Sequence, residues 1–83
     1  MATHYIGADV DGKMTNLAVD KNGKIVKELC VPTTIPSLVA ALESIPRPRK
    51  LTFEEGPMAQ WLARNLREYV DELVVCDPRR NAL

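Results

Sequence analysis

The sequence lacks an excess of charge of either sign, because 11 lysines and arginines balance 11 aspartates and glutamates. Non-specific coating of nucleic acid needs clustered positive charge, so the balance argues against that class of protein while leaving room for a local basic patch. Apolar residues make up 46% of the chain and charged residues 27%, which is typical of a globular protein. With 83 residues, the chain is one small domain, or part of one, with a modest core.

The sequence also lacks a cysteine framework and a long apolar run. Cys30 and Cys76 lie far apart and fit no metal-ligand spacing. Each ends an expected strand, where a free cysteine behaves as a small buried hydrophobe; a disulfide or a ligand role is the alternative. The N-terminus has no signal-peptide pattern, and no run approaches the ~20 apolar residues of a membrane span. We therefore expect a cytoplasmic protein in a reducing compartment, with no membrane partner.

What the sequence does contain is a short apolar strand that ends on an acid, Tyr5-Ile6-Gly7-Ala8-Asp9. Asp11-Gly12 predicts a tight turn into a second strand over residues 15–20. Lys21-Asn22-Gly23 predicts another turn, followed by a third strand over residues 24–31. Three consecutive strands joined by two tight turns predict an antiparallel meander.

The second half of the chain alternates helices and strands. Thr33 or Thr34 is the expected N-cap of a helix that stops before Pro46, and residues 51–54 and 73–76 read as strands on either side of a second helix. The order β-β-β-α-β-α-β predicts an α/β fold with a mixed sheet, in which strands four and five run parallel to strand one. Connection rules favour strand four beside strand one. The second helix carries an apolar stripe interpreted as core, namely Met58, Trp61, Leu62, Leu66 and Tyr69.

An acidic pair carries the chemistry that this strand order suggests. If strands one and four are adjacent and parallel, Asp9 and Glu54 both lie at the carboxyl end of the sheet, where open sheets bind ligands. Carboxylate oxygens suit Mg²⁺ or Mn²⁺, and paired metals stabilise the attacking and leaving oxygens of a phosphodiester. Asp11 is better explained by its turn. Glu55 stays an alternative to Glu54, although strand alternation points it the other way.

Basic residues gather in the connection before strand four. Arg47, Arg49 and Lys50 are expected in a solvated loop, with contact to phosphate as the alternative. Arg79 and Arg80 add two cations near the end of the sequence. These five side chains are the candidate contacts to nucleic acid.

Several stretches, in their order and spacing, resemble the DEDD-type insertion-sequence transposases. The resemblance implies an RNase H-like (RuvC-like) fold and a site of four acidic residues. The first acid of the family falls on Asp9 and the second on Glu54, with Glu55 as the alternative. The matching stretches are residues 5–13, 23–26, 31–34, 53–56, 61–62 and 74–79.

In that family the other two aspartates lie on a helix beyond the fifth strand, and a second domain carries a serine nucleophile. The sequence ends at Leu83, so we expect an N-terminal part of the transposase domain that lacks its final helix. Its metal site would be incomplete, and this polypeptide alone would not cut or join DNA. One sheet face would be left uncovered, which favours homo-oligomers. The resemblance also implies DNA and a guide RNA as partners of the full-length protein.

Other interpretations stay open. Actin-like and sugar-kinase proteins also open with a strand ending in Asp and a hairpin that cradles ATP phosphates, but Val10–Met14 offers one glycine and an extra acid. A non-catalytic module for contacts with protein or nucleic acid is a further interpretation. A Holliday-junction resolvase shares the fold and the use of acids.

Overall fold

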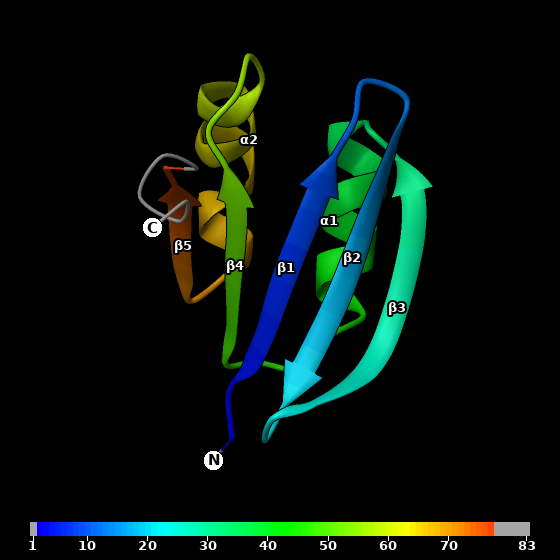
Figure 1. Cartoon of the computed structure of the whole chain (residues 1–83), viewed down its shortest axis with the longest axis vertical. Coiled ribbons are helices and arrows are strands. Elements are labelled where there is room, and N and C mark those ends of the chain that lie inside the picture. The colour runs from blue at the N-terminus through cyan, green and yellow to red at the C-terminus, as the bar shows by residue number, and fades with distance from the viewer. Residues whose placement is uncertain (1, 78–83) are drawn as a thin grey trace.

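The structure, a computed structural model, describes residues 2–77 of the chain. It confirms the predicted order β-β-β-α-β-α-β and adds one 3₁₀ turn before the last strand (Figure 1). Within residues 2–77, neither helix is long and apolar enough to cross a membrane. The elements are β1 (His4–Val10), β2 (Met14–Lys21), β3 (Lys24–Pro32), α1 (Ile35–Glu43), β4 (Arg49–Glu54), α2 (Ala59–Leu66), η1 (Arg67–Tyr69) and β5 (Glu72–Cys76).

The strands form one mixed sheet whose order in space, β3-β2-β1-β4-β5, differs from their order along the chain. β1 and β3 each pair antiparallel with β2, which confirms the predicted meander. β4 pairs parallel with β1, and β5 pairs parallel with β4. The predicted α/β class and the place of strand four beside strand one are therefore confirmed, and β1 is the central strand.

The β2–β3 turn follows from its two residues of positive φ. Asn22 and Gly23 have φ values of 57° and 81°, the combination that a two-residue hairpin of right-handed twist requires. The carboxylate of Asp20 accepts a hydrogen bond from the Gly23 N–H at 3.0 Å. Local sequence thus specifies this turn, and with it the register of the meander.

The start of α1 is tied to the first hairpin by two threonines. Thr34 is the N-cap, and its hydroxyl accepts a hydrogen bond from the Ser37 N–H at 3.3 Å. The Thr33 hydroxyl donates to the Asp11 carbonyl at 2.6 Å and lies 2.8 Å from the hydroxyl of the fully buried Thr15. These contacts hold the helix start against the end of the sheet where β1 finishes.

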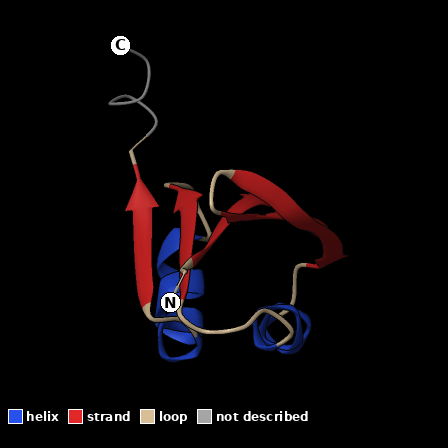
Figure 2. Ribbon diagram, turned by 90° about the horizontal axis from the view of Figure 1, so that it is seen from below, coloured by secondary structure: helices blue, strands red, loops and turns tan. Residues whose placement is uncertain are grey.

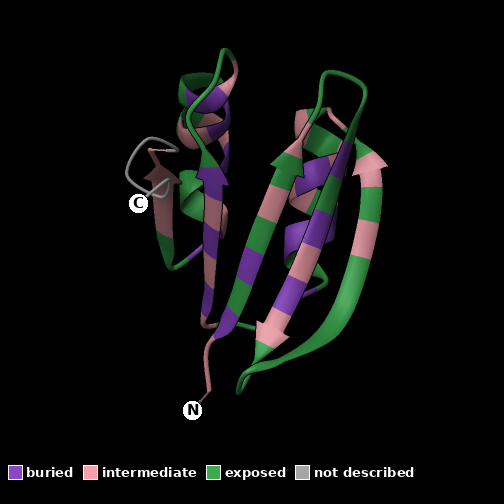
Figure 3. Cartoon of the chain, in the orientation of Figure 1, coloured by how far each residue is buried: buried purple, intermediate pink, exposed green. Residues whose placement is uncertain are grey.

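Both helices cover the same face of the sheet (Figure 2). Side chains alternate between this face and the opposite one, so buried and exposed positions alternate along β1 (Figure 3). We call the uncovered side the open face. The core between the sheet and the helices consists of Ile6, Leu17, Val19, Leu38, Ala41, Leu42, Ile45, Leu51, Phe53, Ala59, Leu62, Leu66 and Val70.

Two packing predictions were wrong, one for the two cysteines and one for Trp61. Cys30 is exposed and Cys76 half-buried, and neither forms a disulfide. Both occupy strand positions on the open face, so the predicted burial does not occur. Trp61 is 39% exposed, while Ala59 takes the expected core position at the start of α2.

Candidate functional site

Asp9 and Glu54 lie on the same face and at the same end of the sheet. The last pair between β1 and β4 is Gly7 with Thr52, and each acid comes two residues later on its strand. Because side chains alternate along a strand, the two acids share the open face with that pair. Beyond it the two strands diverge (Figure 1), so the acids stand on opposite sides of a widening gap.

Cavities occupy this gap, and both acids line two of them. The larger, of about 390 Å³, lies between the end of β1 and the start of α2, with Leu62 among its apolar lining residues. The smaller, of about 320 Å³, lies on the open face and also includes Thr52 and Cys76. The structure thus brings together the two acids that the sequence places at equivalent strand ends.

The two neighbouring acids are placed differently. Glu55 lines the larger of these cavities but not the smaller, and its backbone N–H donates to the Cys76 carbonyl at 2.9 Å. Asp11 lies in the β1–β2 turn, where its carboxylate accepts a hydrogen bond from the Gly12 N–H. Glu54 shares more of the site with Asp9 than Glu55 does.

The donor set at this site consists of carboxylate oxygens, which fit Mg²⁺ or Mn²⁺ better than a thiolate-preferring metal. Among residues 2–77, no three His, Cys, Asp or Glu side chains are grouped closely enough to hold a metal together. Asp9 and Glu54 would therefore supply part of a coordination shell. Cys76, paired with Glu54 across β4 and β5, is a neighbour that sequence reasoning missed, because its register with β4 is set by tertiary structure.

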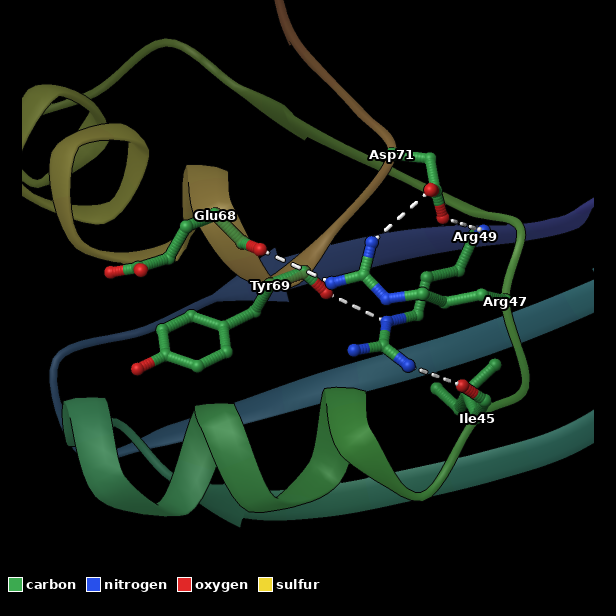
Figure 4. A network of polar contacts seen from close by, with 6 residues as sticks. All are labelled: Ile45, Arg47, Arg49, Glu68, Tyr69 and Asp71. Carbon is green, nitrogen blue, oxygen red and sulfur yellow. Dashed lines mark hydrogen bonds and ion pairs between the residues drawn. The ribbon is translucent and has the colours of Figure 1, made fainter.

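The basic cluster does not form the solvated loop that the sequence predicts. β4 begins at Arg49 rather than at residue 51, and the Arg49 residue is only 5% exposed. Its guanidinium donates to the carbonyls of Tyr69 and Ile45, each at 2.7 Å (Figure 4). Burial, followed by the nearby charge of Arg47, lowers the pKa of Arg49. Because its guanidinium already donates to these carbonyls in the interior, Arg49 is not available to bind phosphate.

Arg47 is exposed but also has protein partners. Its guanidinium lies 3.1 Å from the Asp71 carboxylate and donates to the Glu68 carbonyl at 3.1 Å (Figure 4). The other oxygen of Asp71 accepts the backbone N–H of Arg49 at 2.8 Å. Asp71 therefore joins the start of β4 to the start of β5, at the sheet end opposite to Asp9.

This contact predicts an acid-dependent loss of stability. The hydrogen bond from the Arg49 backbone, aided by Arg47, holds the pKa of Asp71 below its ordinary value. A depressed pKa in the folded state stabilises the protein above the unfolded-state pKa of about 3.9, and this contribution is lost as the pH falls below that value. Urea unfolding should show Asp71→Asn less stable than the parent at pH 7, with the difference shrinking by pH 3. A difference independent of pH would contradict this account.

Lys50 is the candidate cation that shares a face with the acidic pair. Its ammonium lies 5.9 Å from the ring centroid of Tyr5 and 3.7 Å from the Glu72 carboxylate. It lies four residues before Glu54 on the same strand, about 13 Å away at the usual rise per residue. The predicted contacts Arg79 and Arg80 lie outside the described residues.

The open face as a whole is acidic. Among the strand residues of the described chain, the carboxylates on this face outnumber the cation Lys50. A phosphate chain would therefore be repelled here unless bound cations offset the negative charge. By pairing register, the carboxylates on this face are Asp9, Asp20, Glu28, Glu54 and Glu72.

The chain matches no protein-family model, no curated protein and no solved structure.

Proposed function

We propose that the chain is the N-terminal part of an RNase H-like (RuvC-like) domain of a transposase or recombinase that acts on DNA phosphodiesters with Mg²⁺ or Mn²⁺. The observation that carries the proposal is the placement of Asp9 and Glu54. They extend from adjacent parallel strands, on one face, and line the same two cavities. The sheet order β3-β2-β1-β4-β5 supports the proposal, since it places β1 at the centre with β4 beside it.

The two acids would hold the metal, and the metal would polarise a phosphodiester oxygen and offset the charge of the backbone. Asp9 supplies oxygens from the β1 side of the gap and Glu54 from the β4 side. The rest of the lining combines a third carboxylate, Glu55, with apolar side chains such as Leu62 and Pro57.

Because the open face is acidic, the proposal includes the order in which cations and nucleic acid bind. Nucleic acid would approach this face only where bound cations offset the charges of Asp9 and Glu54. Lys50, about 13 Å along β4 from Glu54, would be a candidate contact to phosphate on this face. Arg47, Arg79 and Arg80 stay candidate contacts to nucleic acid in this proposal, whereas Arg49 is withdrawn from it. DNA and guide RNA are the partners proposed for the full-length protein.

The alternative of an ATP-binding hairpin receives less support from the structure. Such a loop needs backbone N–H groups free to meet phosphate. In the β1–β2 turn the Gly12 N–H donates to the Asp11 carboxylate, and the Asp11 N–H donates to the Met14 carbonyl at 3.2 Å. The loop therefore presents a carboxylate where ATP would need donors.

Paramagnetic NMR tests the metal site directly. Titrating Mn²⁺ into ¹⁵N-labelled protein should broaden the amide signals of residues around Asp9 and Glu54 before others, because relaxation by Mn²⁺ falls steeply with distance. Asp9→Asn and Glu54→Gln should each weaken Mn²⁺ affinity about tenfold or more, since each removes a charged ligand.

Matched controls come from the adjacent acids. Asp11→Asn should leave the broadening unchanged, and Glu55→Gln should weaken it less than Glu54→Gln. Broadening that persists in Asp9→Asn would refute the site. Incubating the chain with supercoiled DNA and Mn²⁺ should give no cleavage, because the described carboxylates cannot neutralise two dications; cleavage abolished by Asp9→Ala would show a complete site.

A further inference from the structure

The two edges of the sheet differ in how they are protected against pairing with another strand. β3 carries Lys24, Lys27 and Glu28 and ends on Pro32, and its pairing with β2 shifts register near Val19. Charges, proline and irregular register are features that block edge-to-edge pairing. β5 has one charged residue, Glu72, at its start, followed by the uncharged run Leu73-Val74-Val75-Cys76, and it contains no proline and no register shift. It forms the outer edge of the sheet beside β4 (Figure 1).

The backbone of β5 presents hydrogen-bonding groups at this edge. The Cys76 carbonyl accepts the Glu55 N–H at 2.9 Å, so Cys76 and, by alternation, Val74 direct their backbone groups toward β4. Leu73 and Val75 direct theirs outward. Within residues 2–77, β5 pairs with β4 alone, so these outward groups form an available ladder edge.

A groove lies beside this edge on the helix-covered side. It has a volume of about 730 Å³ and runs between α2 and β5, with Ala59, Ala63 and Val75 among its lining residues. The small alanine side chains leave room next to Val75, which points to this side of the sheet. An apolar side chain from a strand added to β5 would enter this space.

We propose that β5 pairs antiparallel with β5 of a second copy of the chain, about a two-fold axis at Val74. Only this register pairs the strand over its whole length, with Leu73 opposite Val75 of the second copy and Glu72 opposite its Cys76. Leu73 and Val75 of the two copies exchange about four hydrogen bonds. Opposed residues share a face, so Leu73 of each copy enters the groove beside Val75 of the other.

The chemistry of the edge favours a second copy over a different strand. The zero net charge of the chain removes the long-range repulsion that would keep copies apart. The pairing is self-complementary, as a two-fold interface must be. An interface of five paired residues and one inserted leucine per copy buries less surface than the ~1,200 Å² of stable interfaces. The dimer is therefore reversible. It does not depend on Asp9 and Glu54, which lie on β1 and β4, whereas the pairing uses the outer edge of β5.

Disulfide trapping tests the register. In a Cys30→Ser background, Glu72→Cys places a thiol opposite Cys76 of the second copy, in a non-hydrogen-bonded pair whose Cα separation of ~4.5 to 5.5 Å suits a disulfide. Residues 72 and 76 of one strand are about 13 Å apart and cannot bridge within a copy. Mild oxidation should convert most of the protein to a covalent dimer, and Thr52→Cys, on the same face but one strand inward, should not.

Light scattering tests the association without cross-linking. The molar mass of the parent should rise toward twice the chain mass as concentration increases. Val74→Lys sets two like charges opposite each other at the axis and should remain monomeric, whereas the neutral, β-branched Val74→Thr should still dimerise; circular dichroism verifies that both fold. A parent that stays monomeric, or a Val74→Lys variant that dimerises like the parent, would overturn the proposal.

Discussion

Replacing Arg49 by methionine should destabilise the protein by about 2–4 kcal/mol, although methionine fills most of the arginine's volume. The guanidinium satisfies the carbonyls of Tyr69 and Ile45 at 2.7 Å each, from a residue that is 5% exposed. Leaving a buried acceptor without a donor costs about 1–3 kcal/mol. Because a chain of this length is stable by roughly 4–12 kcal/mol, the loss should be evident in the urea midpoint.

The matched control is the neighbouring Arg47→Ala. Its guanidinium also bonds a carboxylate and a carbonyl, but its side chain is 46% exposed. Exposed pairs of this kind contribute about 0–1 kcal/mol. An Arg49→Met variant as stable as the parent would show that water, rather than Arg49, satisfies the two carbonyls.

Arg49 also shows where sequence reasoning stops. The strands, both hairpins and the N-cap of α1 depend on residues close together in the chain, such as Asn22-Gly23 and Thr34, so they can be predicted locally. The burial of Arg49 depends on the Tyr69 carbonyl, which lies 20 residues further along. A run of Arg47, Arg49 and Lys50 reads as a solvated patch, and nothing local shows that the middle residue turns inward.

The candidate site likewise has features that the sequence predicts and features that it does not. The placement of Asp9 and Glu54 follows from two strand ends and one adjacency rule, so the pair could be predicted. The divergence of β1 and β4 after Gly7 and Thr52, which opens the cavities between the acids, could not. The side on which Cys76 lies could not be predicted either, because its register with β4 is set by tertiary structure.

Leu51→Ala should cost about 3 kcal/mol, within the 2–5 kcal/mol typical of a leucine deleted from a core. Leu51 is 1% exposed, on the strand that separates β1 from β5, and it faces the helices. In so small a domain, few apolar side chains are available to shift and fill the cavity that the substitution leaves. Chemical denaturation at pH 7 should show a lower midpoint with an unchanged slope, as expected when stability alone is altered.

The adjacent Thr52→Ala is the control, because Thr52 belongs to the same strand but faces the open side. Its hydroxyl contact to the Ile6 carbonyl is long, at 3.5 Å, so its loss should cost less than about 1 kcal/mol. The ratio of the two costs measures how one-sided the core is. If Thr52→Ala cost as much as Leu51→Ala, the open face would be packed against something in solution. Because β5 pairing adds strands at the edge and leaves this face uncovered, that result would call for a different interface.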